Sequence, residues 1–299
     1  MTPAPPPDED DPSSAVDGLP PLRAVIAKYE LNARKSLGQN FLLDLNLTRK
    51  IARTAGLLTG RTVVEIGPGP GGLTRALLLE GAARVVAIER DHRCIAALDE
   101  VSRRWPDKLH VIEADALDIV WTELVQPYLW PDEPKPLIVA NLPYGIATKL
   151  LVGWLTEPVW PPWYDRMTLM FQREVAERII AAPRTSAYGR LAVLAQWRSE
   201  PEIVLRLPPD AFVPKPKVAS AVVNFSPRGN PQPACEVRAL ARLTAAIFGQ
   251  RRKMLRSSLR QVSTDPARHL EALGLSPELR GEDLDVTTIV ALAAQLDGR

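Results

Sequence analysis

The stretch VVEIGPGPGGLTRALLLEG, residues 63–81, passes from a β-branched apolar run through a glycine-rich turn into a helical pattern. This order predicts a buried strand, a tight turn and a helix. Gly67, Gly69 and Gly72 have the spacing GxGxxG, in which glycines let the backbone turn sharply and approach a ligand closely. The spacing alone is a weak signal, so its meaning depends on the elements that flank it.

Short apolar runs alternate with helix-length segments along most of the chain. They occupy residues 62–67, 84–89, 109–115, 136–141, 167–172, 202–207 and 219–225, and residues 22–58 before them have helical spacing. Buried strands that alternate with helices are typical of a parallel, doubly wound sheet with right-handed crossovers. We therefore predict a Rossmann-like α/β domain.

The two ends of the chain depart from this pattern. Residues 1–20 contain five acidic residues, no Lys or Arg and many prolines, and they lack the features of a signal or transit peptide. Residues 226–233 form a Pro/Gly-rich linker, after which only helical patterns remain. The sequence predicts a disordered extension at residues 1–20, an α/β domain at 21–227 and a small all-α domain at 234–299.

Charge and cysteine content limit the class of protein. The whole chain has 37 basic and 35 acidic residues, so without the five acids of residues 1–20 it holds 37 basic and 30 acidic residues. Cys94 and Cys235 lie far apart, which suggests neither a disulfide framework nor a metal site. No apolar run approaches the roughly 20 residues that span a bilayer. We expect a cytoplasmic protein with no membrane partner.

Two carboxylates follow the glycine-rich turn at the ends of the next two predicted strands. Glu89 is placed to accept hydrogen bonds from an adenosine ribose, and Asp115 to accept one from an adenine amine. The alternatives are that Glu89 is a surface acid paired with Arg90 or Arg93, and that Asp115 is a helix N-cap. Their joint position at successive strand ends favours one adenosine-shaped pocket.

Both NAD and S-adenosylmethionine contain adenosine. A hydride-transfer enzyme also needs a residue that transfers a proton, yet none of His92, His110 and His269 falls at a predicted strand end. S-adenosylmethionine is therefore the favoured cofactor.

The fourth predicted strand runs into Asn141, Leu142, Pro143 and Tyr144. An adenine or cytosine amine is a poor nucleophile because its lone pair is delocalised into the ring. If the Asn141 side-chain oxygen and the carbonyl of Leu142 or Pro143 accept its two protons, the nitrogen can direct its lone pair at a methyl group, while Tyr144 stacks on the flipped base. The alternative is an Asx-type turn with Tyr144 packed on the core.

Basic residues gather toward the carboxyl end. Residues 214–260 contain ten Lys or Arg and one acid, Glu236. Such a surface attracts nucleic-acid phosphates, although a basic helix is more often only a solvated face. The predicted RNA-binding residues are Lys215, Lys217, Arg251, Arg252, Lys253 and Arg256.

Several motifs together give the chain a family resemblance. The stretches SLGQNFLLD (36–44), VVEIGPGPGGLT (63–74), NLPYGIAT (141–148), AFVPKPKVASAVV (211–223) and FGQRRKMLRSSL (248–259) resemble the ribosomal RNA adenine dimethyltransferase family. The resemblance covers residue 22 to the carboxyl terminus and is strongest to its bacterial small-subunit branch. It implies a class I methyltransferase domain, a helical carboxyl-terminal domain, and dimethylation of the N6 amines of two adjacent adenosines in the 3′-terminal hairpin of small-subunit ribosomal RNA.

The resemblance also implies roles for individual residues. It assigns the S-adenosylmethionine pocket to Asn40, Leu42, Gly67, Glu89, Asp115 and Asn141, and the target adenine to Asn141, Pro143 and Tyr144. Phe212 is a candidate for the second face of that adenine, or else a core aromatic. We expect a monomer that acts on a pre-assembled small subunit. The alternatives are a large-subunit methyltransferase of the antibiotic-resistance type and a non-catalytic nucleic-acid-binding relative.

Overall fold

The computed structural model describes residues 16–31 and 39–298. The chain divides into two compact units. The first consists of Met1–Ala147, Tyr164–Phe171 and Val204–Val222, and the second of Thr148–Trp163, Gln172–Ile203 and Val223–Arg299. The second unit therefore takes in segments that precede the linker at residues 226–233.

A seven-stranded sheet has the order β4-β3-β2-β5-β6-β9-β7. Its strands are β2 (Thr62–Ile66), β3 (Arg84–Glu89), β4 (Leu109–Glu113), β5 (Leu137–Ala140), β6 (Arg166–Gln172), β7 (Ser199–Leu207) and β9 (Ser220–Pro227). The β2–β3, β3–β4, β2–β5 and β5–β6 pairs are parallel. All seven predicted strands are confirmed. The β-branched runs of β2, β3 and β5 are buried along almost their whole length, as strands covered on both faces require.

The strand order reverses at β2, since β3 pairs with one edge of this strand and β5 with the other. In an open α/β sheet the crossover helices diverge at such a point, and a crevice forms beyond the carboxyl ends of the strands. The glycine-rich turn directly follows β2. The topology therefore directs the turn, the end of β3 and the end of β5 to one crevice.

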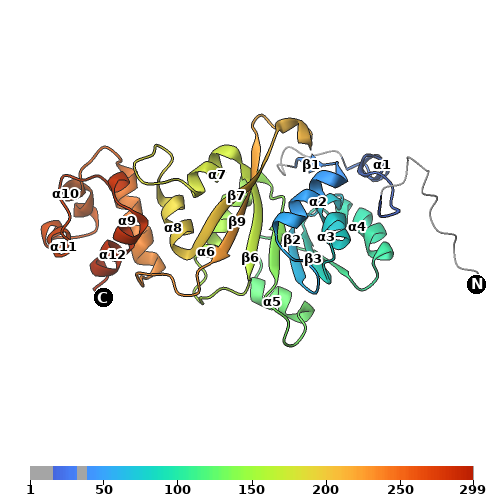
Figure 1. Ribbon diagram of the computed structural model, residues 1–299, viewed down its shortest axis with the longest axis horizontal. Helices are drawn as coiled ribbons and strands as arrows, with labels where there is room; N and C mark the ends of the chain where they lie inside the picture. Colours follow the sequence, from blue (N-terminus) through green and yellow to red (C-terminus); the bar gives the residue numbers. More distant parts are fainter. Residues whose placement is uncertain (1–15, 32–38, 299) are drawn as a thin grey trace, which may run out of the picture. The chain divides into compact units, whose positions relative to one another are not determined.

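Helices cover this part of the sheet. They are α2 (Leu45–Thr54), α3 (Gly72–Leu79) and α4 (His92–Arg104), and α1 (Leu22–Lys28) packs against α4. Figure 1 shows α2, α3 and α4 beside β2 and β3. Helices α2 and α3 share one core with these strands, whereas Val25 of α1 packs against Cys94 and Ala97 of α4. This packing holds the start of α3 against the carboxyl end of β2.

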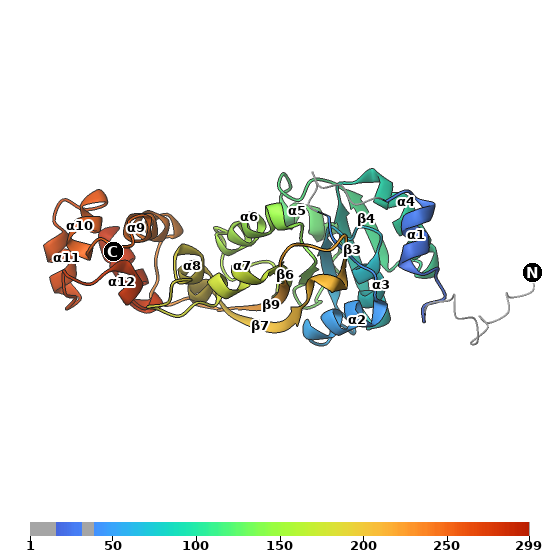
Figure 2. The ribbon, with the colours of Figure 1, turned by 90° about the horizontal axis from the view of Figure 1, so that it is seen from above.

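The second unit is mainly helical. Its core joins α8 (Arg190–Arg198), α9 (Val237–Gly249), α10 (Leu255–Ser258), α11 (Pro266–Ala272) and α12 (Val286–Leu296). The last four helices gather at the carboxyl-terminal end of the chain (Figures 1 and 2). The other α-helices in the described part of the chain are α5 (Trp121–Val125), α6 (Tyr144–Leu155) and α7 (Arg173–Ile179). From Val237 to residue 298 the regular elements are all helical, which confirms the predicted helical carboxyl-terminal region.

The amino-terminal segment departs from the predicted disordered extension at Asp17. Residues 1–15 of the predicted disordered extension lie outside the described residues, but Asp17 is buried. Its carboxylate accepts hydrogen bonds from Arg75 Nε at 2.5 Å and from Arg75 Nη2 at 2.6 Å. The prediction of a solvated extension is wrong for Asp17, because composition does not reveal a partner 58 residues away.

Two short strands were not predicted. β1 (Phe41–Leu42) and β8 (Phe212–Val213) form an antiparallel pair, with Leu42 opposite Phe212. Two-residue strands have no periodicity that a sequence pattern can reveal. This pair fixes the segment after residue 38 next to the glycine-rich turn, since a Cβ on Gly69 would lie 3.1 Å from the Phe41 ring.

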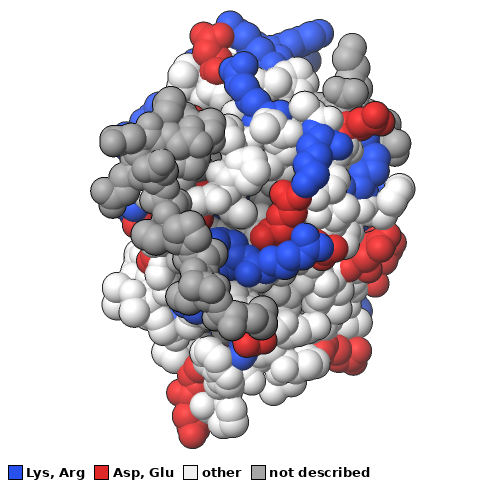
Figure 3. All heavy atoms as spheres, turned by 90° about the vertical axis from the view of Figure 1, so that its right-hand side faces the viewer, with Lys and Arg blue, Asp and Glu red and all other residues white. Residues whose placement is uncertain are grey.

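One face of the molecule shows how its charges are distributed. On the face in Figure 3, Lys and Arg side chains lie interspersed with Asp and Glu.

None of the helices in the described part of the chain is long and apolar enough to span a bilayer.

Candidate functional site

A cavity of about 350 Å³ lies in the first unit, at the carboxyl ends of the central strands. This volume is within the usual range of small-molecule sites. Ten of the residues that the sequence assigned to catalysis or to the cofactor line it: Asn40, Leu42, Gly67, Gly69, Glu89, Asp115, Asn141, Leu142, Pro143 and Tyr144. They come from segments up to about 100 residues apart in the chain, so the fold brings together what the sequence only lists in order.

Glycine is required in the turn after β2 for two different reasons. Gly69 has a φ of 57°, and its N–H donates to Glu89 Oε2 at 3.0 Å. A Cβ on Gly72, the first residue of α3, would lie 2.9 Å from the Leu42 carbonyl oxygen. The first glycine therefore permits the left-handed turn, and the second lets the helix start pack against the 39–42 segment.

Glu89 ends β3 and is almost fully buried. Besides the Gly69 bond, its Oε1 accepts the N–H groups of Arg90 at 2.8 Å and of Asp91 at 2.7 Å. Burial raises the pKa of Glu89, and the three backbone bonds oppose that rise. A carboxylate has about four acceptor positions, so Glu89 retains capacity for a ligand hydroxyl.

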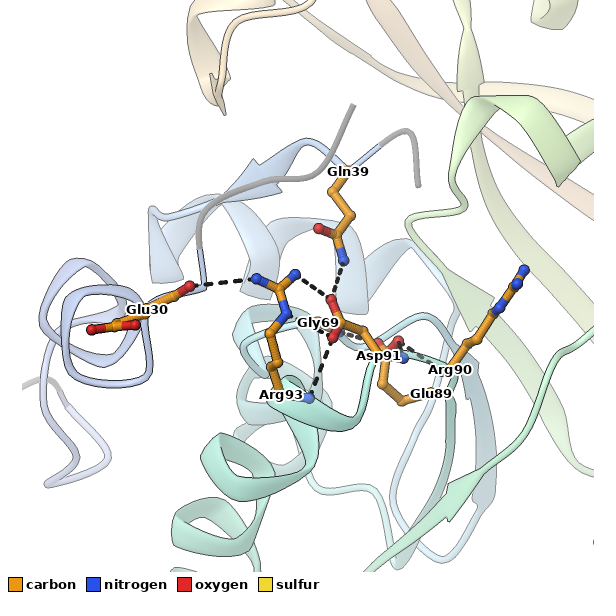
Figure 4. A network of polar contacts seen from close by, with 7 residues as sticks. All are labelled: Glu30, Gln39, Gly69, Glu89, Arg90, Asp91 and Arg93. Carbon is orange, nitrogen blue, oxygen red and sulfur yellow. Dashed lines mark hydrogen bonds and ion pairs between the residues drawn. The ribbon is translucent and has the colours of Figure 1, made fainter. Parts of the chain in front are cut away.

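The alternative interpretation of Glu89, a surface acid paired with arginine, is wrong. Arg90 pairs instead with Asp115, and Arg93 with Asp91. In Figure 4 the Arg90 guanidinium points away from the Glu89 carboxylate.

Asp115 has partners on both of its oxygens. Oδ1 accepts the N–H of Leu117 at 3.0 Å, and Oδ2 pairs with Arg90 Nη1 at 2.8 Å. The carboxylate thus stabilises a turn after β4 and also lines the cavity. Its contact with an adenine amine stays a prediction.

Sequence reasoning missed a polar network around Asp91. Its Oδ2 accepts Gln39 Nε2 at 3.2 Å, and Arg93 binds the same carboxylate through Nε and Nη2 (Figure 4). Arg93 also reaches the Glu30 carbonyl at 3.4 Å. The bonds from Arg93 are the main cause that lowers the pKa of Asp91 to about 2. The sequence feature that could have pointed to Asp91 is its position as the N-cap of α4. That position does not reveal the hydrogen bond to Gln39.

The corner after β5 has a defined amide orientation. Asn141 Nδ2 donates to the Asn40 carbonyl at 3.2 Å. A carbonyl can only accept, so the amide nitrogen faces Asn40 and Oδ1 is left as an acceptor on the other side. The Pro143 carbonyl accepts the N–H groups of Ile146 at 3.0 Å and Ala147 at 3.1 Å. It is therefore used by the first turn of α6, which leaves Leu142 as the better candidate for a second acceptor.

Tyr144 is the first residue of α6, and its ring is partly buried. Its hydroxyl lies 2.6 Å from Ser220 Oγ, and either group can be the donor. Burial raises the pKa of Tyr144, so the phenol stays neutral near pH 7. The ring both lines the cavity and, through Ser220, contacts the core, so its part in binding the adenine stays a prediction beside the alternative of a ring packed on the core.

Phe212 is the exception among the predicted site residues. It is 2% exposed, belongs to the core shared by α2, α3 and the sheet, and does not line the cavity. The predicted second stacking face is therefore not available on this ring. The pairing of Phe212 with Leu42 in β1–β8 explains its burial, and the motif alone did not distinguish the two roles.

The predicted RNA-binding residues fall into two groups. Lys215 pairs with Asp210 at 2.5 Å, and Arg251 pairs with Glu282 at 3.1 Å. Arg251 also reaches the Thr185 carbonyl, so its guanidinium is largely occupied by contacts within the second unit. The remaining four are exposed: Lys217, Arg252, Lys253 and Arg256.

The reversal of strand order at β2, with a glycine-rich turn and a buried strand-end carboxylate over one cavity, is the arrangement of class I S-adenosylmethionine-dependent methyltransferases. The residues present fit that cofactor. Glu89 keeps acceptor capacity at the wall of the cavity, and the glycine turn lets a ligand approach the backbone. The protein is an enzyme of this class.

The family model described as ribosomal RNA adenine dimethylase matches residues 30–290, and the chain belongs to this family. It is 57% identical to ribosomal RNA small subunit methyltransferase A of Azorhizobium caulinodans, over 94% of each chain. It is 58% identical to the protein of the same name from Bradyrhizobium sp. (strain BTAi1), over 95% of this chain and 96% of the relative.

Two solved structures extend the comparison. A dimethyladenosine transferase from Plasmodium falciparum has a TM-score of 0.71 and 24% identity over 85% of this chain and 96% of its own, which shows the shared fold. The 23S rRNA methyltransferase ErmE has a TM-score of 0.62 and 30% identity over 86% of this chain and 100% of its own.

Proposed function

We propose that the protein dimethylates the N6 amines of two adjacent adenosines in the 3′-terminal hairpin of small-subunit ribosomal RNA. The choice of subunit is supported by relatives named for the small subunit at 57% and 58% identity, against 30% for ErmE, which is named for 23S rRNA. The observation that carries the chemistry is the Asn141 amide, which the Asn40 carbonyl orients with its oxygen left to accept. We further propose a cytoplasmic monomer that acts on a pre-assembled subunit.

S-adenosylmethionine, when bound, supplies a methyl group made electrophilic by its sulfonium centre. Glu89 would accept a ribose hydroxyl through its remaining acceptor position, and the glycine turn at Gly67 and Gly69 would let the cofactor approach the backbone. Asp115 accepts from the adenine amine while Arg90 holds its carboxylate in place.

Asn141 and Leu142 orient the target amine. In the first methyl transfer the Asn141 Oδ1 and the Leu142 carbonyl each accept a hydrogen bond from one N–H of the amine, which draws the nitrogen lone pair out of conjugation with the ring; in the second transfer one N–H remains to be accepted. We assign the second acceptor to Leu142 because the Pro143 carbonyl already accepts two N–H groups of α6. Catalysis then rests on positioning and on preorganised dipoles, and it requires no strong base.

Tyr144 supplies a stacking face for the flipped adenine, an interaction worth about 1–3 kcal/mol per base. Arg252, Lys253 and Arg256 contribute phosphate contacts from the second unit, since they are exposed. Such contacts add affinity and carry no sequence information.

Single-turnover transfer of labelled methyl groups at saturating cofactor tests this function. Undermethylated small subunits should be methylated on adenine N6, and large subunits should not. Asn141→Ala should lower the rate about 10²–10³-fold, the typical effect of removing one preorganised hydrogen bond at a reacting centre. Because Asn141 also lines the cofactor cavity, its S-adenosylmethionine affinity is measured separately. A wild-type rate for Asn141→Ala would refute the proposed mechanism, and exclusive methylation of large subunits would refute the proposed substrate.

A further inference from the structure

The hydroxyl of Ser220 contacts the functional site indirectly, through the hydroxyl of Tyr144. Ser220 is the first residue of β9, is 0% exposed and is not among the residues that line the cavity. Its Oγ lies 2.6 Å from the Tyr144 hydroxyl, within the first unit. The contact joins the start of β9, a core strand, to the Tyr144 ring, which faces the site. The two residues are 76 positions apart in the sequence.

This contact gives the Tyr144 ring two points of attachment. The backbone at the start of α6 holds one end of the ring, and Ser220 holds the hydroxyl at the other end. A change of the Tyr144 χ1 rotamer would move the hydroxyl by several ångströms and break the bond. Rotation of the ring about its own axis leaves the hydroxyl in place, so the bond fixes the position of the ring axis. The bond therefore selects one ring position out of those that the backbone allows.

We propose that Ser220 is a positioning residue for the reaction, which holds the Tyr144 ring in the orientation that receives the flipped adenine. The proposal rests on the proposed function, in which Tyr144 stacks on the target base. Ser220 acts only through Tyr144 and contacts neither the base nor the cofactor. The residue lies on a rigid core strand, so the ring is held before the base arrives and less ordering is left to occur on capture.

The test uses three variants that lack the hydrogen bond between the two hydroxyls. Ser220→Ala removes the serine hydroxyl, Tyr144→Phe removes the tyrosine hydroxyl, and the double variant removes both. Base capture is followed by the fluorescence of 2-aminopurine placed at the target position in undermethylated small subunits. Each single variant should weaken capture and lower kcat/KM for the subunit about two- to tenfold, the range of one net hydrogen bond. The double variant should be no worse than the more impaired single variant, because the same bond is lost in all three.

Ser199→Ala is the matched control. Ser199 is also fully buried and also begins a strand of the sheet. Its replacement by Ala removes one hydrogen bond of 2.7 Å, to the Ala195 carbonyl. The Ser199 hydroxyl bonds to a residue that does not line the cavity, whereas Ser220 bonds to Tyr144, which does, so the Ser199→Ala variant should keep wild-type capture. The conservative variant Ser220→Thr keeps the hydroxyl and should retain more activity than Ser220→Ala. S-adenosylmethionine affinity, measured by calorimetry, should be unchanged in all these variants.

Two kinds of failure are distinguishable. If Tyr144→Ala leaves capture unchanged, Tyr144 does not stack on the base, and the stacking step of the proposed function is wrong. If Tyr144→Ala abolishes capture while Ser220→Ala and Tyr144→Phe both capture normally, stacking stands and the positioning role of Ser220 is refuted. Multiplicative effects of the two single substitutions in the double variant would also refute it, since independent losses do not arise from one shared bond.

Discussion

Asp17→Ala is expected to destabilise the protein strongly, although the sequence around Asp17 has the composition of a solvated tail. Both carboxylate oxygens of Asp17 accept from Arg75, and Oδ1 also accepts the N–H of Leu19 at 3.1 Å. The Asp17 side chain is 0% exposed and that of Arg75 is 2% exposed. Removing the carboxylate leaves a guanidinium of α3 buried without its counter-ion.

The size of the effect follows from this burial. Removing one partner of a buried ion pair typically costs about 3–5 kcal/mol. Arg75 Nη1 keeps its bond to the Pro20 carbonyl at 2.8 Å. We therefore expect a loss near the lower end, about 3 kcal/mol in the free energy of unfolding. Asp17→Asn keeps an acceptor oxygen and should lose less.

Urea unfolding followed by far-ultraviolet circular dichroism measures this loss. The matched control is Asp210→Ala, which breaks an ion pair with Lys215 whose side chains are 76% and 61% exposed. An exposed pair contributes about 0–1 kcal/mol, so the control should unfold almost like the wild type. The double variant Asp17→Leu/Arg75→Met removes both buried charges and should recover much of the stability.

The comparison has a clear negative outcome. If Asp17→Ala and Asp210→Ala lose equally little stability, the Asp17 carboxylate is not buried against Arg75 in solution. If the Asp17→Leu/Arg75→Met variant is no more stable than Asp17→Ala, the loss does not arise from the unpaired guanidinium.

Three further predictions concern the site and its charges. Glu89→Ala should weaken S-adenosylmethionine binding by about 1–3 kcal/mol, the scale of lost charge-assisted hydrogen bonds, and unchanged affinity in calorimetry would contradict the pocket assignment. Glu65 is fully buried beside this pocket, and burial raises its pKa to about 8. The folded state therefore holds this proton more tightly than the unfolded state does, and Glu65 should make the wild type less stable as pH rises from about 4.5 to about 8. Glu65→Gln should remove that part of the pH dependence. If the difference in unfolding free energy between the wild type and Glu65→Gln is the same at pH 5 and at pH 9, Glu65 does not cause that dependence. Replacing Arg252, Lys253 and Arg256 with Ala should reduce affinity for the small subunit and flatten its dependence on salt concentration, because fewer counterions are released; an unchanged slope would mean that these side chains form only a solvated face.

Local patterns were sufficient to predict the sheet and the elements of the site. Each of the seven strands contains a short, mostly apolar run, and the central strands β2, β3, β5 and β6 are buried along almost their whole length, as strands covered on both faces require. The glycine-rich turn and the Asn141 corner were recognised because their residues are adjacent in sequence. Glu89 was located because a strand end can be inferred from the strand itself.

The partners of these residues came only from the tertiary structure. Asn141 bonds to the Asn40 carbonyl across 101 residues, and Tyr144 to Ser220 across 76. The sequence left Leu142 and Pro143 as equal acceptors, and the start of α6 distinguishes them by using the Pro143 carbonyl.

Burial is the other property that the sequence did not reveal. Asp17 has the neighbours of a solvated tail but is buried against Arg75, and Phe212 has the motif of a site residue but is buried in the core. Secondary structure depends largely on periodicity within a segment, so the sequence by itself determined the seven strands of the main sheet, the helical carboxyl-terminal region and the glycine-rich turn, but not the two-residue strands β1 and β8. The partner and the exposure of a side chain depend on which distant segments pack against it, and only the folded chain decides that.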